Sequence, residues 1–205
     1  MRKTDGKPRM ARLVAGLLGL AACAGPPITT AKPAPESQLQ VAVRGLLASQ
    51  ADGRLGSVRG FGFIKASIRV LLADGEVSLI PSTPQLEAAL APLQRRWWEG
   101  RRQPRPAQEA QQAFTIMTAQ RTAVGRLGGE SLVRFAKTDA QGQFSLEQVP
   151  AGRWLLVADI SSAVSVVLWA VPLEVAAGET TPVFLADENI LLEARREKAE
   201  AGAGR

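Results

Sequence analysis

The chain has 205 residues, of which 46% are hydrophobic and 21% are charged, and its mean hydropathy is +0.01. This composition excludes a disordered chain and a protein with many membrane spans, and the length predicts one domain with additions. The net charge of +6 gives little support to nucleic-acid binding, because residues 1–22 alone carry +4 of it.

Residues 1–22 have the three-part layout of a secretory signal. The basic start MRKTDGKPRMAR precedes the apolar run LVAGLLGLAA, which is too short for a comfortable membrane span. Leu20-Ala21-Ala22-Cys23 ends this run and resembles the lipobox of bacterial lipoproteins. The resemblance implies that Cys23 becomes the mature N-terminus and carries a lipid anchor. A plain signal peptide with an incidental cysteine and a transmembrane helix are the two alternatives.

The residues after the lipobox predict where the protein is held. Ala24 follows Cys23 where an aspartate would imply retention, so the same resemblance implies the outer rather than the inner membrane. Residues 23–37 are rich in proline, alanine and hydroxyl residues without apolar periodicity, and they predict an extended tether. We therefore expect a protein of the cell envelope whose membrane partner is reached through the lipid on Cys23.

Period-two patterns follow the tether. Residues 38–50 alternate apolar and polar side chains and predict a half-buried strand. The glycine-rich stretch 51–62 predicts a turn or an irregular link. Residues 65–83 predict a β-hairpin that turns at Ala73-Asp74-Gly75.

The period changes to 3.6 in residues 82–128, which we interpret as a helical insertion. Thr83 followed by Pro84 predicts a helix start, because the hydroxyl caps a backbone N–H and proline has none to satisfy. Pro92 predicts a kink or an early end of this helix. After a break over residues 95–106, residues 106–123 predict a second helix. The expected apolar stripe of the first helix consists of Leu86, Ala89, Leu90, Leu93 and Trp97.

Strand patterns return after the insertion. Asp139-Ala140-Gln141-Gly142 and Val149-Pro150-Ala151-Gly152 predict two turns, with Phe144 pointing inward between them. Two more strands are expected around the glycine turn at residues 176–180, and residues 191–205 predict a short charged helix that runs into a loose tail. The total of about seven strands with close turn signals predicts an all-β, Ig-like β-sandwich.

The two turns carry a resemblance to a known family. The run from Thr138 to Leu146, followed by Val149-Pro150-Ala151-Gly152, resembles the T-D-x-x-G-x-F hairpin and V-P-A-G turn of the carboxypeptidase regulatory-like domain. The resemblance implies a prealbumin-like β-sandwich over residues 38–190, interrupted by the insertion at 82–128. It gives the motif residues a structural role in turns and core and none in catalysis: Thr138, Asp139, Gly142, Phe144, Pro150 and Gly152.

The most unusual local composition lies at the end of the first predicted helix. Its arginines and tryptophans predict an interaction surface for a protein or a membrane: Arg95, Arg96, Trp97, Trp98, Arg101 and Arg102. The alternative is one tryptophan packed on the sandwich with solvated arginines around it. Export to the envelope argues against a nucleic-acid partner.

These features predict a non-catalytic binding or scaffolding module of the cell envelope, with envelope proteins or cell-wall polymer as partners. The sequence has no histidine and so lacks the commonest metal ligand, and we expect no metal and no cofactor. One alternative is sugar or cell-wall binding through exposed aromatic rings. Another is an envelope hydrolase in which two carboxylates face one cleft, drawn from the acids near predicted strand ends: Asp159, Glu174, Asp187 and Glu188.

Overall fold

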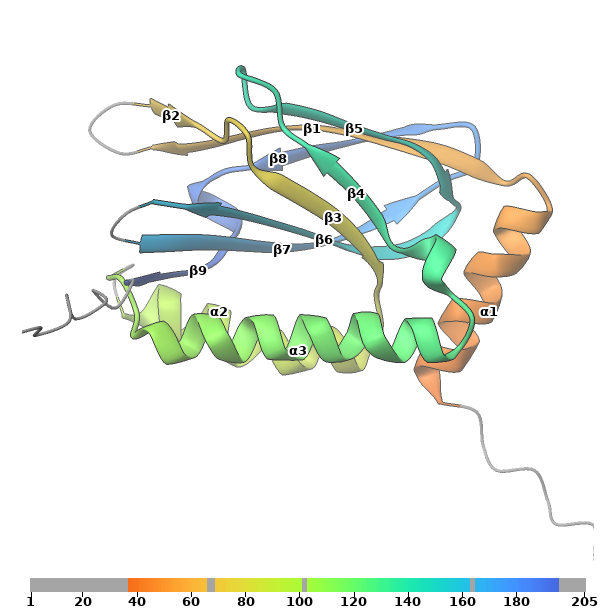
Figure 1. Ribbon diagram of the computed structural model, residues 1–205, viewed down its shortest axis with the longest axis horizontal. Coiled ribbons are helices and arrows are strands. Elements are labelled where there is room, and N and C mark those ends of the chain that lie inside the picture. Colours follow the sequence, from red (N-terminus) through yellow and green to blue (C-terminus); the bar gives the residue numbers. More distant parts are fainter. Residues whose placement is uncertain (1–36, 66–68, 101–102, 163–164, 196–205) are drawn as a thin grey trace, which may run out of the picture. The chain divides into compact units, whose positions relative to one another are not determined.

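The computed structural model describes residues 37–65, 69–100, 103–162 and 165–195 (Figure 1). All of them belong to one compact unit, Pro35–Arg205. The predicted signal, the predicted lipidation site Cys23, most of the predicted tether, Arg101 and Arg102 lie outside the described residues, as does the tail from residue 196.

The described chain forms two β-sheets with three α-helices. The first sheet contains four strands, which are β1 (Leu55–Lys65), β2 (Arg69–Leu71), β5 (Gln143–Pro150) and β8 (Thr180–Leu185). The second has the order β4-β3-β6-β7-β9, with β4 (Arg134–Lys137), β3 (Glu76–Pro81), β6 (Gly152–Ser161), β7 (Ser165–Val175) and β9 (Ile190–Arg195). The two sheets are consistent with the predicted sandwich, although the described strands number nine and not about seven.

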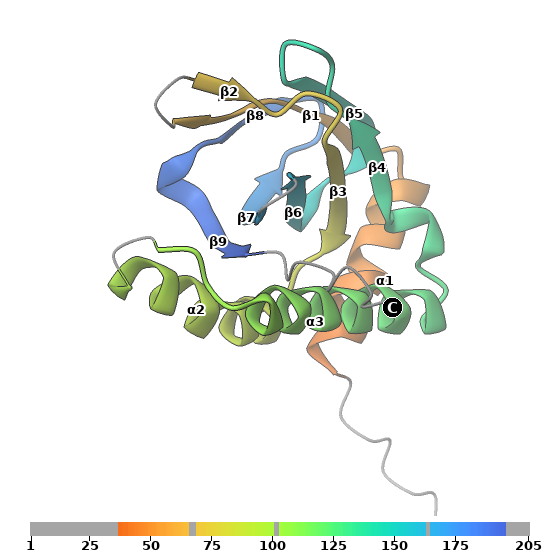
Figure 2. The same cartoon turned by 60° about the vertical axis from the view of Figure 1, so that its left-hand side comes forward.

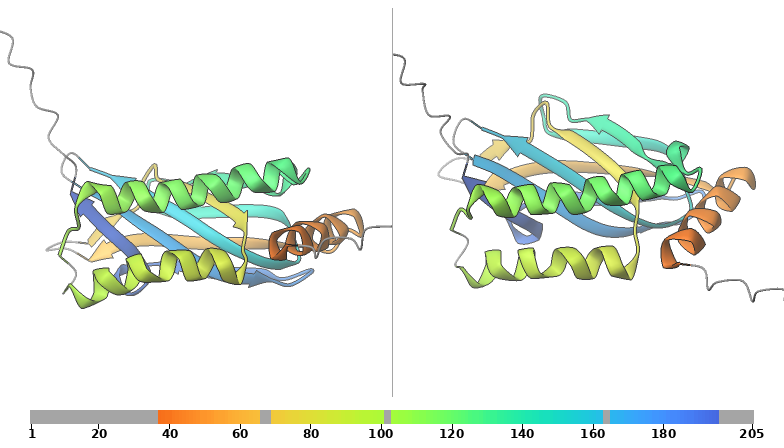
Figure 3. Two further views of the ribbon diagram at one scale, coloured as in Figure 1. Left: turned by 90° about the horizontal axis from the view of Figure 1, so that it is seen from below. Right: turned by 60° about the horizontal axis from the view of Figure 1, so that its bottom comes forward.

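The two longest helices pack on the same side of the two sheets. α2 (Pro84–Glu99) and α3 (Ala107–Arg126) lie side by side across the outer face of the second sheet, while α1 (Gln38–Ala51) lies at one end of the strands (Figures 1 and 3). Strand β6 is therefore buried on both faces, and every residue from Trp154 to Ala158 is buried. The substantial helix content makes the prediction of an all-β chain too narrow.

The prediction of a strand over residues 38–50 is wrong, because this segment forms α1. Ser37 and Gln40 form a capping box, in which each side chain accepts a hydrogen bond from the other residue's backbone N–H. Val43 and Leu46 are buried at helical spacing, which the alternation of Leu39, Val41 and Val43 concealed.

The glycine-rich stretch 51–62 is also corrected, since most of it belongs to β1 and not to an irregular link. Its glycines make room for side chains of the core between the sheets. A Cβ atom on Gly60 would overlap the ring of Phe144, and one on Gly62 would lie 2.7 Å from a methyl group of Leu72. Glycine in a strand commonly marks such a close approach.

The predicted hairpin over residues 65–83 is replaced by a change of sheet. β2 pairs antiparallel with β1, whereas β3 pairs with β4 and β6 in the other sheet. The turn at Asp74 and Gly75 therefore carries the chain across the sandwich, with Asp74 in a left-handed conformation at φ 55°. The residues between β2 and β3 belong to no strand, and the buried side chain of Thr138 holds them in place. Thr138 Oγ1 accepts from Gly75 N at 2.8 Å and donates to the carbonyl of Leu72.

The two predicted helices are confirmed, with corrections in the first. Thr83 Oγ1 accepts from Leu86 N at 3.2 Å, as expected of an N-cap. Leu86, Leu90, Leu93 and Trp97 are buried, but Ala89 is exposed and lies off the stripe. The helix does not end early at Pro92 and continues to Glu99, so the break begins at Gly100 and not at residue 95.

The end of the described chain differs from the predicted charged helix. Residues 190–195 form β9, which pairs antiparallel with β7 and places Leu192 opposite Leu168. Leu191, Leu192 and Ala194 are buried, so this segment completes the second sheet despite the charged residues that follow it.

Candidate ligand-binding face

The outer face of the first sheet is covered by none of the described helices (Figures 1 and 2). We call it the open face. Since side chains alternate along a strand, the outward positions follow from the buried inward ones, such as Val58, Phe144 and Val183. Among the described side chains of β1, β5 and β8, the open face consists of Arg59, Phe61, Phe63, Gln143, Ser145, Glu147, Thr180, Pro182 and Phe184.

Three phenylalanines lie together on the open face. Phe61 of β1 is the direct register partner of Phe184 on β8, so their side chains lie next to each other on neighbouring strands. Phe63 follows two residues later on β1, and its ring centroid lies 5.6 Å from that of Phe61. Phe184 is 65% exposed, which is unusual for a large apolar side chain. Phe61 and Phe63 are half-buried. Burial of the exposed parts of these rings by a partner is favourable, so the cluster indicates a binding surface.

A polar row lies beside the phenylalanines on the β5 side. Phe61 is opposite Gln143, and Arg59 is opposite Ser145. Arg59 Nη2 lies 3.4 Å from Glu147 Oε1, which also accepts from Ser145 Oγ at 2.5 Å. The polar residues Arg59, Gln143, Ser145 and Glu147 line a shallow hollow of about 570 Å³, together with Lys137 at the end of β4 and Asp139 in the turn that follows. The open face thus joins apolar rings to closely spaced hydrogen-bonding groups.

The hydrogen bond from Ser145 is the main reason that the pKa of Glu147 is lowered; desolvation opposes this change, and Arg59 adds smaller contributions that lower the pKa further. The lowered pKa keeps this carboxylate charged, and therefore an acceptor only, to more acidic pH than usual. Glu147 is thus a fixed acceptor at the centre of the polar row.

The free edge beside the open face is protected against strand addition. Ser57 N donates to Glu179 O, so Glu179 directs its carbonyl toward β1. In a parallel ladder every second residue of a strand does this, and the residues between direct their N–H and C=O groups to the other side. On β8 these are Thr180, Pro182 and Phe184. Pro182 has no N–H to offer, and the carbonyl of Phe184 accepts from Asn189 Nδ2 at 2.6 Å. A partner is therefore better held on the face of this sheet than along its β8 edge.

The motif residues of the predicted family lie in turns and in the core. Asp139 Oδ1 accepts from the backbone N–H groups of Gln141 and Gln143 at 2.9 and 2.8 Å, and Gly142, at φ 78°, donates to the carbonyl of Asp139. Phe144 is buried against Gly60. In the following turn the carbonyl of Pro150 accepts from Trp154 Nε1 at 2.9 Å.

That second turn carries the chain from β5 in one sheet to β6 in the other. Gly152 adopts φ 146°, and a Cβ atom there would lie 2.6 Å from Leu46 of α1. Glycine is therefore required at this position both by its conformation and by the close packing of α1.

The predicted interaction surface at the end of α2 is not assembled by the described residues. Trp97 is 2% exposed and packs in the core, so it is withdrawn from the surface. Trp98 is half-buried and packs against the core. Arg96 Nε lies 3.5 Å from Glu109, which also pairs with Arg105, and Arg95 is exposed. This arrangement agrees with the alternative of a packed tryptophan with arginines around it.

Two carboxylates do lie next to each other, on the covered side of the molecule. Glu76 and Asp159 are register partners on β3 and β6 and line an enclosed hollow of about 90 Å³ beside Arg121 of α3. Burial raises the pKa of Asp159, Glu76 raises it further, and Arg121 partly opposes the change. Arg121 itself donates to Ser78 Oγ at 2.6 Å.

This acid pair does not support the hydrolase alternative. Both carboxylates project from the same face of one sheet, whereas glycoside hydrolysis needs acids that flank the bond from two sides. The hollow is also smaller than the roughly 300 Å³ at which small-molecule pockets begin. Of the four acids predicted, Asp159 lies here, and its partner Glu76 was not among them.

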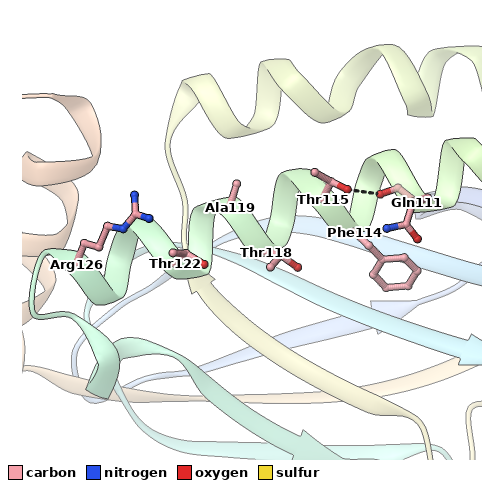
Figure 4. Close-up of a pocket in the computed structure, with 7 residues that line it drawn as sticks. All are labelled: Gln111, Phe114, Thr115, Thr118, Ala119, Thr122 and Arg126. Atoms are coloured by element: carbon pink, nitrogen blue, oxygen red, sulfur yellow. Dashed lines mark hydrogen bonds between the residues drawn. The ribbon is translucent and has the colours of Figure 1, made fainter.

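A larger hollow of about 450 Å³ lies on the flank of α3 (Figure 4). All of its lining residues come from this one helix, and Thr115 Oγ1 is already used within it, donating to the carbonyl of Gln111 at 2.8 Å. No second element contributes a converging group. We interpret this hollow as the surface of an exposed helix and not as a site.

The exposed aromatic residues differ from those that the sequence suggested. Trp154 and Trp169 are fully buried, and their indole N–H groups donate to the carbonyls of Pro150 and Ala186. Within the described part of the chain, the large exposed apolar residues are Val41, Phe135 and Phe184. Phe61 was overlooked because its stretch was interpreted as a link, and its pairing with Phe184 spans more than half of the chain.

Two kinds of feature are absent from the described residues. No group of three acidic, histidine or cysteine side chains lies close enough together among them to hold a metal ion. None of their helices is long and apolar enough to cross a membrane.

No protein-family model matches the chain, and no curated protein matches it either. Among solved structures, it is similar at 16% identity and a TM-score of 0.38 to a candidate carbohydrate-binding protein of Pseudomonas aeruginosa, over 64% of this chain and 88% of that one. It is also similar to the minor pilin GBS52 of Streptococcus agalactiae, at 8% identity and a TM-score of 0.35, over 74% of this chain and 49% of that one.

A third similar structure is the pilus backbone protein RrgB of Streptococcus pneumoniae, at 13% identity and a TM-score of 0.30, over 62% of this chain and 40% of that one. The chain thus spans less than half the length of either pilus protein. The resemblance of the two turns to the carboxypeptidase regulatory-like domain stays a prediction.

Proposed function

We propose that this chain is a non-catalytic binding module of the cell envelope that holds a glycan polymer on its open face. One observation carries the proposal: Phe61, Phe63 and Phe184 lie together on an uncovered sheet, directly beside the polar row of Arg59, Gln143, Ser145 and Glu147. A sugar ring has an apolar face that packs on an aromatic ring and hydroxyl groups that bond to side chains around it. The open face offers both kinds of group next to each other.

The shape of the open face favours a polymer over a small ligand. The hollow of about 570 Å³ is broad and shallow, and three strands contribute to the face. Small ligands are instead bound in clefts that surround most of their surface. A chain of sugars lying across the strands would bury the phenylalanines without needing a deep pocket.

The cellular setting of the proposal comes from the sequence. The lipobox-like Leu20-Ala21-Ala22-Cys23 and the proline-rich residues 23–37 support an anchor and a tether that hold the sandwich at a membrane, with the outer membrane as the expected site. The motif around Asp139 and Gly142 supports a prealbumin-like sandwich. A Cys23→Ser variant that still fractionated with membranes would contradict the anchor.

Co-sedimentation tests the binding function. The purified chain is mixed with a panel of insoluble glycans that includes peptidoglycan sacculi, chitin, cellulose and mannan. We expect retention by at least one of them and, for the double variant Phe61→Ala/Phe184→Ala, affinity reduced about tenfold or more, as for truncation of interface anchors. Phe135→Ala is the matched control, because Phe135 is also exposed but lies on β4 in the other sheet.

Two results would overturn the proposal. Retention by no glycan of the panel would remove the function itself, and capture of an envelope protein through the open face would then indicate scaffolding. Equal losses for Phe135→Ala and for the double variant would show that binding does not take place on the open face.

A further inference from the structure

We infer that the glycan held on the open face is uncharged, and that Arg59 and Glu147 determine this specificity. The inference rests on the proposed function and concerns the same face. It follows from two observations: the distribution of the charged side chains on this face, and the donors and acceptors of Arg59 and Glu147 that remain available to a ligand.

The charges that line the shallow hollow of the open face cancel. Two basic side chains, Arg59 and Lys137, line the shallow hollow with two acidic ones, Asp139 and Glu147. Arg59 and Glu147 form an ion pair at 3.4 Å, so neither presents an isolated charge. Among the described residues that line the hollow there is therefore no excess of arginine or lysine with which to attract an acidic polymer, and no excess of carboxylates to attract a basic one.

Both acids are also oriented by other groups. Glu147 Oε1 accepts from Ser145 Oγ, and Asp139 Oδ1 accepts from two backbone N–H groups of its own turn. A carboxylate fixed in this way cannot swing aside for an anionic ligand, and it would repel one. The lowered pKa of Glu147 preserves this charge at acidic pH.

The ion pair of Arg59 and Glu147 can still form hydrogen bonds with hydroxyl groups of a ligand. The side chains of Arg59 and Glu147 are 66% and 56% exposed. Arg59 carries five N–H donors, and within the described residues one of its nitrogens, Nη2, bonds to Glu147. Neighbouring hydroxyls of a sugar are donors and acceptors at once, so they match a site that offers a guanidinium and a carboxylate together.

Affinity electrophoresis of the full chain tests the inference with polymers that share a backbone and differ in charge. The probes are neutral hydroxyethylcellulose against anionic carboxymethylcellulose, and neutral glycol chitin against cationic glycol chitosan. We expect retardation by a neutral polymer that persists as salt is raised, because exposed charge interactions are screened and stacking is not. The charged member of the same pair is expected to retard the chain less.

Variants separate charge from geometry. Glu147→Gln leaves one uncompensated cation and is expected to raise retention by carboxymethylcellulose about two- to fivefold, the range of exposed charge interactions. Arg59→Lys keeps the charge but loses the planar fork, so it is expected to weaken retention by the neutral polymer without changing the preference between neutral and anionic. Arg95→Gln, on α2, is the charge-changing control and is expected to do neither.

The outcomes distinguish this inference from the proposed function. Salt-sensitive retention by a charged polymer, with none by its neutral partner, would overturn the inference and leave the binding function in place. An unchanged charge preference in Glu147→Gln would overturn the role of the ion pair. Retention by no polymer here, together with none by the insoluble panel, would remove the function and the inference together.

Discussion

The two outer faces of the sandwich differ in whether helices cover them. The face of the second sheet is buried under α2 and α3, and along β6 the residues from Trp154 to Ala158 are buried on both sides. The open face of the first sheet remains uncovered and still carries Phe61, Phe63 and Phe184. Apolar side chains on the covered face stabilise the fold, whereas Phe184 on the open face is 65% exposed and buries little of its ring.

The strands themselves show this difference. A strand with helices on one face and a second sheet on the other is a continuous apolar run, as in Trp154 to Ala158. A strand with one solvated face alternates, as β5 does with buried Phe144 and Leu146 between exposed neighbours. Phe184 breaks this alternation on β8 by placing a ring where a polar residue is expected. An exposed apolar residue that breaks the apolar–polar alternation of an uncovered sheet, as Phe184 does, is therefore a candidate for a functional role.

The largest effect on stability is expected on the covered side. Leu93→Ala removes a side chain that is 1% exposed between α2 and the second sheet. We expect a loss of about 2–5 kcal/mol in the free energy of unfolding, as for other buried leucines. Urea denaturation followed by circular dichroism measures it. A loss below about 1 kcal/mol would show that α2 does not pack as tightly as the structure indicates.

A smaller loss is expected beneath the open face. Gly60→Ala places a methyl group against the ring of Phe144 and is expected to cost about 1–3 kcal/mol through overpacking. Gly45→Ala is the matched control: Gly45 lies in α1 with no atom within 4 Å of a Cβ, so the same change should stabilise the chain by about 0.5–1 kcal/mol. If both variants lost stability equally, the packing of Phe144 over β1 would be contradicted.

The acid pair under α3 predicts a dependence on pH. Because the folded-state pKa of Asp159 is raised, folding favours its protonated form. Its contribution to stability is therefore greatest at pH values below the unfolded pKa of about 3.9, and it is lost as the pH rises through the folded pKa. Asp159→Asn should melt at a higher temperature than the wild type near neutral pH, with the difference shrinking at acidic pH.

Thermal scans across this pH range measure the effect. Glu188→Gln, which neutralises an exposed acid in another part of the chain, serves as control. A variant Asp159→Asn that is less stable than the wild type near neutral pH would mean that Arg121 compensates the charge more than burial penalises it.

The smallest effect on stability is expected for the open face itself. Phe184→Ala truncates a ring that is 65% exposed, and we expect the free energy of unfolding to change by less than about 0.5 kcal/mol. Glycan binding should nevertheless fall. A large loss of stability would mean that Phe184 supports the fold, and the comparison between the two faces would no longer hold.

Local signals predicted the parts of the fold that depend on local contacts. The cap at Thr83, the helices that follow and the turn at Asp139 each depend on residues within a few positions of one another. The segment from 38 to 51 failed because its alternating valines suggested a strand, although Ser37 and Gln40 carried the signal of a capping box. Of the two local signals in that segment, the capping box and not the alternation indicates the structure that forms.

The rest of the fold depends on contacts that sequence distance conceals. In the sequence, Gly60 and Gly62 indicate a turn or a link. In the folded chain they lie in a strand and make room for Phe144 and Leu72, and these contacts cannot be identified from the sequence alone. The candidate site was missed for the same reason, since Phe61 and Phe184 meet through a parallel pairing across the whole domain. The predicted interaction surface included Trp97, which is buried in the core.

The most direct measurement of the central claim is a nuclear magnetic resonance titration of the ¹⁵N-labelled chain with a soluble fragment of the glycan that retains it. We predict that shifts of backbone amides concentrate in β1, β5 and β8, around Arg59, Phe61 and Phe184, while α2 and α3 remain unperturbed. Shifts concentrated in the helices, or around Glu76 and Asp159 beneath α3, would contradict the account and place the binding site on the covered side.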